Sequence, residues 1–502
     1  MSPNDWVLGI DLGTTNTAAV AFGPERPGPL SILHGRQSPV LPSVVSLKNP
    51  STPLVGWLAK DMLLTDPLTT LHGWKRFLGR REQSEYVNRH RSRFPYRIHE
   101  DPQRRLGAVV HGQVVNFHEV ARLVLDQVRR QASAALRAEV RRCVISVPAH
   151  FAKAQRDAVL EAGTEAGLEV LRLVNEPTAA SIAFAMDQKL DSRALVFDLG
   201  GGTFDASVLE LVDNIFDVKA ADGESFLGGI DFDRAVMDHL VDHVKKTAKF
   251  DPTEEPVVAQ RLLNAAEAAK CALSNEASTR IHVPMVGHDR RGRTFDLDLE
   301  FSRAELEAAT APLVERCIGI VEKTIAQAGL RVDEIDHVVI IGGQSRMPLV
   351  RRRIAETMGQ EPLTHLNPDT CVAHGAALVA RSETDLSGAV LLDVLSVPIG
   401  VVFPGGETRF VFERNDSLPA RRRVPLPRPQ HGQGVSMGLW QGVDVTSSDR
   451  QVLGVLHVAP HHFREGTDFA IEMNLDEQLQ LNVAFVSSIE RIPLVLSPSR
   501  QT

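Results

Sequence analysis

The stretch Ile10-Asp11-Leu12-Gly13-Thr14-Thr15 decides the fold, because it returns later in the chain as Phe197-Asp198-Leu199-Gly200-Gly201-Gly202-Thr203. Both copies follow an apolar, strand-like run, and both place a carboxylate at its end, ahead of a turn of glycine and threonine. A repeat of this kind indicates two related lobes that face each other. We therefore predict a layered α/β architecture in which the two turns meet.

Each of these turns has the residue types that bind a phosphate group. Glycine lets the backbone come close to a ligand, and successive N–H groups in a tight turn form an anion-binding concavity. Asp11 and Asp198 would repel phosphate directly, so a cation between them is indicated. Magnesium suits this position, because it keeps several waters and bridges carboxylates to phosphates. Two such hairpins can hold a triphosphate from opposite sides.

Several common nucleotide and hydrolase motifs are missing from the sequence. One Asp-Leu-Gly turn alone would be an ordinary β-turn, but the pair is specific. No Gly-Lys dipeptide occurs, so the chain has no P-loop lysine. Gly-x-Ser-x-Gly and His-Glu-x-x-His are also absent, which excludes two frequent hydrolase signatures.

Composition is typical of a globular protein with several cores. The chain has 502 residues, 43% of them hydrophobic, and a net charge of −8, which leaves no global electrostatic footprint for nucleic acid. The four cysteines are far apart and form no Cys-x-x-Cys pair, so we expect reduced thiols and a cytoplasmic protein. The sequence shows no secretory signal and no run of about 18 apolar residues, so we expect no membrane partner.

The predicted secondary structure changes along the chain. Strands are predicted at Trp6–Ile10, Cys143–Val147, Ala194–Phe197 and His337–Ile341, with helical spacing over Phe117–Arg142 between them. Ser302-Arg303-Ala304-Glu305 is a capping box that predicts a helix to about Ala328. From Pro398 onward the predicted strands are short. Apolar residues alternate with other residues along Gln478–Phe485, as in a half-buried strand. The C-terminal part is therefore predicted to be an all-β sandwich.

Further segments carry candidate functional residues. Trp74–Arg80 places Lys75 in the first lobe, and Asn175–Ala180 puts Glu176 just before a proline at a helix start. Ile341–Pro348 reads as a strand, a glycine turn and a helix. In Ala266–Ser274 the polar residues share one helical face, which is equally consistent with a solvated stripe.

Together these residues, in order from Ile10 to Ala377, resemble the heat shock protein 70 family of DnaK-type molecular chaperones. Val390-Leu391-Leu392-Asp393 is similar to the apolar-acidic linker of that family, and Asn415–Pro419 resembles its β-domain loosely. The resemblance implies an actin-like ATPase domain, a duplicated ribonuclease H-like fold of two lobes, over residues 1–385. It also implies an interdomain linker over 386–394 and a β-sandwich substrate-binding domain over 395–502.

The resemblance also implies roles for individual residues toward ATP or ADP. Asp11 and Asp198 would hold Mg²⁺, and Asp205 would hold a monovalent cation such as K⁺. Lys75 would lie by the γ-phosphate, and Glu176, Asp198 and Thr203 would position the attacking water, in agreement with the needs of phosphoryl transfer. The implied nucleotide contacts are Thr14, Thr15, Gly200, Gly201, Gly202, Gly229, Glu267, Lys270, Ser274, Gly342, Gly343, Arg346 and Asp369. The implied interdomain coupling residues are Pro148, Arg156, Leu391, Leu392 and Asp393.

The sequence departs from the family pattern at several places. Ile230 replaces an acidic residue, Cys271 an arginine or aliphatic residue, and His150 a tyrosine, which puts nucleotide affinity in question. The sequence up to Thr502 shows no amphipathic lid pattern, so we expect a short form with an uncovered cleft and fast peptide release. The basic, proline-rich stretch Arg421–Gly434 falls near the expected cleft loops.

The resemblance implies an ATP-dependent chaperone that binds and releases unfolded or extended peptides, with a J-domain co-chaperone and a nucleotide exchange factor as partners. Two alternatives stay open. One is an ATP-switched regulatory or scaffold protein with a specific partner. The other is a small-molecule kinase on the same fold, although the linker and the β-domain count against it.

Overall fold

The computed structural model describes residues 6–497, apart from 24–27, 186–191, 213–214, 290, 365, 384–389, 427, 431–432 and 465–467. The predicted boundary at residues 385–386 and the first part of the predicted linker lie outside the described residues. None of the helices in the described part has the length and apolar character that crossing a bilayer requires.

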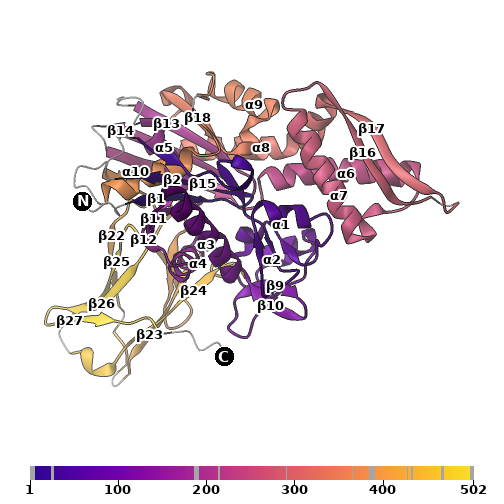
Figure 1. The fold of residues 1–502 in the computed structure, drawn as a ribbon. Coiled ribbons are helices and arrows are strands. Elements are labelled where there is room, and N and C mark those ends of the chain that lie inside the picture. Colours follow the sequence, from indigo (N-terminus) through magenta and orange to yellow (C-terminus); the bar gives the residue numbers. More distant parts are fainter. Residues whose placement is uncertain are drawn as a thin grey trace.

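Two sheets with the same topology form the centre of the molecule (Figure 1). In the first lobe an antiparallel β1–β2–β3 meander adds a parallel strand, β11, beside β1, and then β12. In the second lobe β13–β14–β15 forms the meander, and β18 pairs in parallel with β13. The shared order follows from the repeated sequence. The strands are β1 (Val7–Leu12), β2 (Asn16–Phe22), β3 (Leu30–Ser31), β4 (Val40–Pro42), β11 (Arg142–Val147), β12 (Glu169–Asn175), β13 (Ser192–Leu199), β14 (Phe204–Val212), β15 (Ile215–Glu224) and β18 (His337–Ile341).

Helices α5 and α10 lie between the two sheets (Figure 1). One apolar core joins Val20 and Val144 of the first sheet, Val196 and Leu209 of the second, and the alanines of both helices. The helices cross closely, because Gly375 lies against the backbone of α5 and a Cβ there would overlap it. The lobes therefore share a base at this core, and the cleft opens above it. The helices are α5 (Glu176–Ala185) and α10 (Cys371–Ser382).

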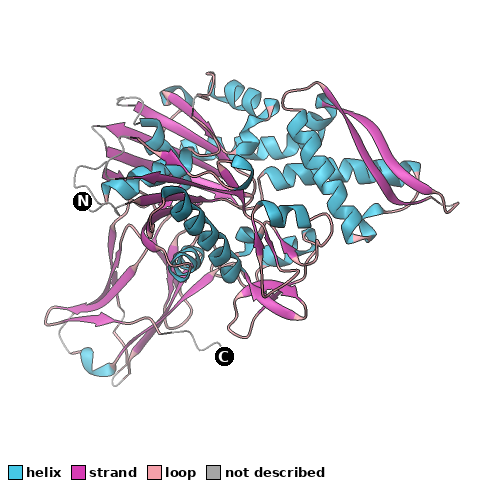
Figure 2. Ribbon diagram, in the orientation of Figure 1, coloured by secondary structure: helices cyan, strands magenta, loops and turns pink. Residues whose placement is uncertain are grey.

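Smaller elements extend each lobe away from the shared core. Two three-stranded sheets belong to the first lobe, and the β16–β17 hairpin projects from the second (Figure 2). The strands are β5 (Val45–Ser46), β6 (Leu54–Val55), β7 (Thr70–Leu71), β8 (Ile98–Glu100), β9 (Leu106–Val110), β10 (Gln113–Asn116), β16 (Ser278–His288) and β17 (Thr294–Ser302). The helices are α1 (Trp57–Met62), α2 (Glu85–His90), α3 (Phe117–Leu136), α4 (Lys153–Glu165), α6 (Gly229–Thr247), α7 (Pro256–Ala272), α8 (Arg303–Gln327) and α9 (Pro348–Met358).

Element boundaries agree with the sequence in some places and differ in others. The strand at His337–Ile341 and the capping box at Ser302 are confirmed. The helix predicted over Phe117–Arg142 is wrong in length: it ends at Leu136, because Arg137 takes a left-handed backbone with φ of 50°. The predicted strand start at Gln478 is also wrong, because the Asp476 carboxylate accepts N–H groups at 2.9 and 2.7 Å and turns the chain there.

The C-terminal part forms two facing four-stranded sheets around their own apolar core, as a sandwich. Leu439 and Leu456 of one sheet and Ile471 and Phe485 of the other are buried in it. The predicted all-β sandwich is confirmed. The sheets are β21 (Thr408–Phe412), β20 (Ile399–Val402), β23 (Val435–Gln441) and β24 (Gln451–Val458), and β22 (Ala420–Pro425), β25 (Phe469–Leu475), β26 (Leu481–Ser487) and β27 (Arg491–Leu494).

The segment before the sandwich adds a strand to the second lobe. Strand β19 (Val390–Leu392) pairs in parallel with β15, with Leu391 opposite Phe216 and Leu392 opposite Asp217. Leu391 packs against the core shared by the two lobes. The described part of the predicted linker is therefore docked on the second lobe through residues 390–392.

Candidate functional site

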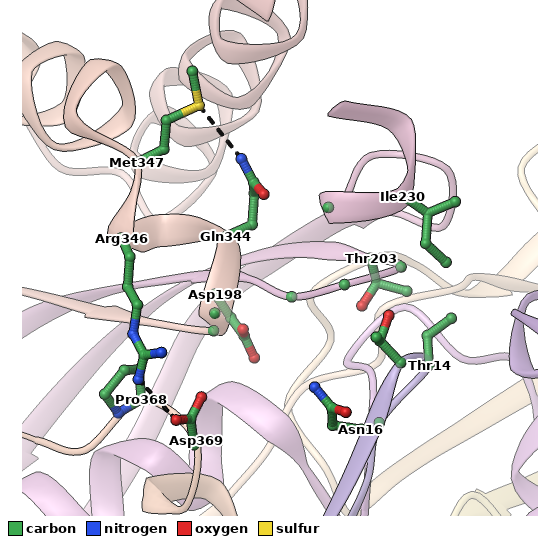
Figure 3. A pocket seen from close by; sticks show the side chains of 18 of the residues that line it. Thr14, Asn16, Asp198, Thr203, Ile230, Gln344, Arg346, Met347, Pro368 and Asp369 are labelled. Carbon is green, nitrogen blue, oxygen red and sulfur yellow. Dashed lines mark hydrogen bonds and ion pairs between the residues drawn. The ribbon is translucent and has the colours of Figure 1, made fainter. Parts of the chain in front are cut away.

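A cavity of about 860 Å³ lies between the lobes, within the usual size range of ligand pockets (Figure 3). Both glycine-threonine hairpins open into it: Thr14 from the first lobe and Thr203 from the second face each other, with Asp198 beside them. Almost all the predicted site residues line this cavity. They are Asp11, Thr14, Thr15, Lys75, Glu176, Asp198, Gly200, Gly201, Gly202, Thr203, Gly229, Glu267, Lys270, Ser274, Gly342, Gly343, Arg346 and Asp369.

The two hairpins interlock, because one carries side chains where the other has none. A Cβ at Gly201 would overlap the Thr15 side chain, and a Cβ at Gly202 would overlap Thr14. Thr15 Oγ1 is buried and has no hydrogen-bond partner within the described part of the chain. It is therefore a donor that remains available to a ligand. Packing therefore requires glycine at positions 201 and 202 of the second hairpin.

Carboxylates gather at the base of the cavity around one lysine. Lys75 Nζ lies 2.8 Å from Glu176 Oε1, and both side chains are buried. Burial raises the pKa of Glu176 to about 7, against the lowering effect of Lys75. Burial and the charge of Glu176 hold the pKa of Asp198 well above its usual range, and burial likewise raises that of Asp11. The cluster is thus short of positive charge.

This donor set fits Mg²⁺. The ion prefers one or two carboxylates plus phosphate oxygens and waters to a cage made of protein alone. The described residues contain no group of three or more His, Cys, Asp or Glu that could hold a metal ion by itself. Asp11 and Asp198 come from opposite lobes at equivalent positions, and Ser146 Oγ donates to Asp11 Oδ1 at 2.9 Å. A divalent ion would supply the positive charge that the raised carboxylate pKa values indicate is missing.

Asp205 lies behind the second hairpin and does not line the cavity. His150 Nδ1 lies 3.0 Å from Asp205 Oδ1, and His150 Nε2 hydrogen-bonds Ser225 Oγ. Asp205 Oδ2 has no hydrogen-bond partner among the described residues. One oxygen of this buried carboxylate thus contacts His150, and the other could accept a further donor.

Sequence reasoning missed Arg76, which is fully buried beside Lys75 in the short 3₁₀ helix Trp74–Phe77. It crosses from the first lobe to donate to the Gly202 carbonyl at 2.9 and 2.7 Å, and it pairs with Asp231. Arg93 also pairs with Asp231, at 3.1 Å. A buried arginine must find an acceptor, but nothing near Arg76 in the sequence identifies these partners. Arg76 therefore fixes the second hairpin from the opposite lobe.

The side of the cavity formed by α7 carries charged pairs. Lys270 Nζ lies 2.7 Å from Asp233 Oδ1, and burial raises the pKa of Asp233 to about 6. Glu267 reaches across the cleft to Lys60 at 3.4 Å, so it connects the lobes. Lys270 and Glu267 share the helical face that was predicted. Cys271 is exposed at the rim of the same cavity.

The opposite side of the cavity follows β18. Gly342 has φ of 81°, and a Cβ there would overlap the Leu199 carbonyl, so glycine is required at this turn. Arg346 Nη2 lies 2.8 Å from Asp369 Oδ2 (Figure 3). The pair forms a flat, charged wall beside the two glycines Gly342 and Gly343. Such a surface can stack on a planar base.

Ile230 projects into the cavity near Thr14 and Thr203 (Figure 3). Its backbone N–H donates to the Gly201 carbonyl at 2.8 Å, so it also helps to hold the second hairpin. An acidic residue here would add negative charge opposite the phosphate turns. Isoleucine instead presents an apolar side chain to this part of the cavity.

Two of the predicted coupling residues, Arg156 and Asp393, meet at Asn175. Asn175 donates to Asp393 Oδ2 at 2.6 Å and accepts from Arg156 Nη2, and it directly precedes Glu176. Burial raises the pKa of Asp393, while Arg156 lowers it. Leu391 and Leu392 belong to the docked strand, and the Pro148 carbonyl accepts the Phe151 N–H at 3.1 Å. Asn175 thus connects Asp393 to Glu176, the next residue in the chain.

Glutamines of the sandwich complete the contact between the domains, and they were not predicted. Gln441 and Gln451 accept the N–H groups of Lys153 and Ala154 at 2.8 and 3.1 Å, at the start of α4. Gln478 accepts the Leu173 N–H at 3.3 Å. The Lys153 and Ala154 N–H groups belong to the first turn of α4, where no acceptor inside the helix is available, so the sandwich caps α4.

Comparisons with known proteins agree with this geometry. A family model described as Hsp70 protein matches residues 7–459. Chaperone protein DnaK from each of two strains of Thermus thermophilus is 38% identical over 450 residues, which cover 89% of this chain and 72% of the relative. The predicted actin-like ATPase domain followed by a β-sandwich is thereby confirmed. The chain belongs to the Hsp70 family of ATP-hydrolysing molecular chaperones.

Proposed function

We propose that ATP is hydrolysed between the two hairpins, with Lys75 beside the γ-phosphate and Glu176 orienting the attacking water. One observation carries the proposal: a buried lysine and three acidic side chains, Asp11, Glu176 and Asp198, converge where two phosphate-binding turns meet. Phosphoryl transfer needs positioning and charge neutralisation more than covalent chemistry. Thr203 supports the water from the second lobe.

We assign Mg²⁺ to Asp11 and Asp198, where it would neutralise charge on the phosphates. The nucleotide contacts proposed from α7 and from the turn after β18 are the residues of the cavity walls described above. Asp205, with one open oxygen, is our candidate ligand for K⁺. ATP would thus be bound mainly by backbone N–H groups, hydroxyls and bridging cations.

We propose that nucleotide and peptide binding are coupled through the docked strand β19. In the structure this strand pairs with β15 and Asn175 donates to Asp393, while the sandwich is seated on the ATPase lobes. ATP would favour this seated arrangement and peptide release, and hydrolysis would favour undocking and tight peptide binding. This is a coupling free energy between two sites. We take 1–385, 386–394 and 395–502 as the three functional parts.

Unfolded or extended peptides are the proposed substrates, and a J-domain co-chaperone and a nucleotide exchange factor are the proposed partners. The four cysteines are free thiols, which supports a reducing cytoplasm as the compartment. The family match does not favour a scaffold or a small-molecule kinase.

Steady-state ATPase activity, with and without Mg²⁺ and an unstructured leucine-rich heptapeptide, tests the proposal. We expect Lys75→Ala to abolish ATP hydrolysis, while calorimetry still detects binding of ATP to the variant. The control Lys48→Ala removes an exposed lysine and should hydrolyse ATP at the wild-type rate. Turnover of Lys75→Ala at the wild-type rate would reject the role of Lys75.

The linker has its own test. Leu391→Asp places a charge against the shared core, so we expect it to undock β19 and to remove peptide stimulation of the ATPase. Val495→Asp adds the same charge at a side chain that is 83% exposed and serves as the control. Normal stimulation in Leu391→Asp would contradict the proposed coupling.

A further inference from the structure

A second contact between the sandwich and the ATPase lobes lies away from the linker. The β23–β24 loop, residues 442–450, meets the start of α2 in the first lobe. Ser448 Oγ accepts the Glu85 N–H at 2.9 Å, and Asp449 Oδ1 accepts the Tyr86 N–H at 3.2 Å. The Ser84 hydroxyl, which is the N-cap of α2, also contacts Asp449. The sandwich therefore supplies acceptors for the first N–H groups of this helix.

The loop is built to present these acceptors. Asp444 Oδ1 accepts from Thr446 N and Oγ1 at 2.7 and 2.8 Å, and Ser447 Oγ accepts the Asp449 N–H at 3.1 Å. The Arg450 N–H donates to the Ser447 carbonyl at 3.2 Å. Because the loop is held by its own hydrogen bonds, docking loses little conformational entropy in it.

The side chain of Tyr86 connects this end of α2 to the second lobe. The Tyr86 ring lies 3.5 Å from the guanidinium carbon of Arg80 and 4.7 Å, centroid to centroid, from Phe226. At the other end of α2, the His90 ring stacks on Phe226 at 3.7 Å with an angle of 7° between the planes. A six-residue helix of the first lobe thus touches the sandwich at one end and a buried residue of the second lobe at the other.

Phe226 and its neighbour Ser225 lie next to catalytic structure. Arg80 Nη2 donates to Ser225 Oγ at 3.4 Å, and Ser225 contacts His150, which contacts Asp205. Three residues after Phe226, the Gly229 N–H donates to the Gly200 carbonyl at 2.9 Å, in the second hairpin. One branch ends at Gly200 in the second hairpin, and the other ends at Asp205, two residues after Thr203 of that hairpin. The described residues therefore connect the loop 442–450 to the second hairpin by unbroken contacts.

We propose that α2 forms a second coupling route, in which Ser448 and Asp449 act on the second hairpin through Arg80, Tyr86 and His150 as positioning residues. The proposal rests on the proposed function, since it adds to the linker route. The Ser448 and Asp449 contacts exist only in the seated arrangement, so they favour that state by a differential interaction. His150 is central, because its two ring nitrogens contact Ser225 and Asp205 at once.

Hydrogen exchange of the Glu85 and Tyr86 amides tests the contact without any assay of activity. In the full chain with ATP, we expect these amides to exchange slowly, and to exchange about tenfold or more faster in the Ser448→Ala/Asp449→Ala double variant. Glu407→Ala removes an exposed carboxylate of the same sandwich and should leave both amides protected. Unchanged protection in the double variant would overturn the contact.

Peptide stimulation of the ATPase tests the route itself. We expect the ratio of stimulated to unstimulated rate to fall about three- to tenfold in Asp449→Ala, while peptide affinity without nucleotide stays as in the wild type. His150→Phe keeps the ring, loses both nitrogen contacts, and should show a similar fall. A wild-type ratio in both variants would overturn the route.

Combined variants separate this route from the linker. The double variant Asp449→Ala/His150→Phe should lower the ratio of stimulated to unstimulated ATPase rate no further than either single variant, because both changes interrupt the same route. In Asp449→Ala/Asn175→Ala the fold-losses of the two single variants should multiply, because the changes interrupt different routes. The reverse pattern would reject a separate route. If peptide fails to stimulate the ATPase of even the wild type, the proposed function is wrong. Hydrogen exchange of the Glu85 and Tyr86 amides would still test whether Ser448 and Asp449 contact α2.

Discussion

The two phosphate-binding hairpins are repeats of one another, yet they differ in a way that explains why both are needed. The first, at Gly13-Thr14-Thr15, projects two adjacent threonine side chains, whereas the second carries three glycines, Gly200-Gly201-Gly202, before its one threonine, Thr203. Thr14 and Thr15 occupy the space that the glycines leave free. Two identical copies would either collide or leave a gap. The duplication therefore became a pair of complementary surfaces, with donors on one side and room on the other.

The hairpins also differ in how each is fastened. The Gly13 carbonyl accepts from the neutral Ser43 hydroxyl at 2.7 Å, within the same lobe. The Gly202 carbonyl accepts from the charged Arg76 of the opposite lobe. A charged donor makes the stronger hydrogen bond, and this one also depends on how the lobes meet. The first hairpin is thus a fixed part of its lobe, and the second is held by the closure of the cleft.

Gly202→Ala should break the complementarity and have the largest effect. The added Cβ would overlap Thr14, so the hairpins must separate, and we expect the catalytic efficiency kcat/KM for ATP to fall about a hundredfold or more. Adding Thr14→Gly should restore part of the loss, because the space is returned. Steady-state kinetics measures both variants.

A control shows that added volume is the cause. Gly319→Ala lies in helix α8 where a Cβ meets nothing within 4 Å, so activity should stay at the wild-type level. Equal activity of Gly202→Ala and the wild type, or no recovery with Thr14→Gly, would mean that the two surfaces do not interlock as described.

Arg76→Met tests the fastening of the second hairpin. It removes one partner of a buried ion pair and two donors to Gly202, which destabilises by about 3–5 kcal/mol. The midpoint of thermal unfolding and the ATPase rate should both fall. Arg36→Met removes an exposed pair with Asp61 and should change stability by less than about 1 kcal/mol. Similar results for the two variants would contradict the cross-lobe role of Arg76.

The same contrast separates what the sequence could and could not predict. Asp11, Thr14, Gly201 and the turn at Gly342 were predictable, because their chemistry is contained in a few adjacent residues and is needed for local backbone geometry. Arg76 was not, because its partners Gly202 and Asp231 lie far along the chain. The fold class followed from the repeated strand-turn unit. The length of α3 did not, since it depended on one left-handed residue, Arg137.

The contacts between domains show the same limit. Leu391 and Asp393 were predicted from a recognisable linker pattern, which is short and continuous. Gln441, Gln451 and Asp449 were not, because an exposed glutamine or aspartate in a β-loop acquires its role only when a second domain is seated against it. His150 was visible as an unusual residue, but its partners Ser225 and Asp205 were not.

Lowering the pH should destabilise the part of the first lobe that lies next to the first hairpin. A cavity of about 60 Å³ beneath Thr14 and Thr15 is lined by His72, whose pKa burial lowers to about 4. The unfolded chain binds this proton near pH 6.5 and the folded chain does not, so stability is complete above 6.5 and is lost as pH falls toward 4. At pH 5 the loss is about 2 kcal/mol. The midpoint of thermal unfolding should therefore fall less between pH 7 and pH 5 in His72→Gln than in the wild type. An equal fall in the two proteins would be evidence against a neutral, buried His72.

Ser43→Ala should have the smallest effect, because the first hairpin does not depend on one side chain. The hydroxyl donates to the Gly13 carbonyl and contacts Thr17 Oγ1 at 2.9 Å, but the Ser43 N–H still donates to the Thr15 carbonyl at 2.8 Å in the variant. Loss of one neutral hydrogen bond costs about 1 kcal/mol, so the thermal midpoint should fall slightly and ATP turnover should fall less than in Arg76→Met. Thr17→Val, which leaves the Gly13 carbonyl bonded, is the matched control and should retain full turnover. If Ser43→Ala instead lost as much activity as Arg76→Met, the first hairpin would be as dependent on a single donor as the second, and the difference between the two would lie in their side chains alone.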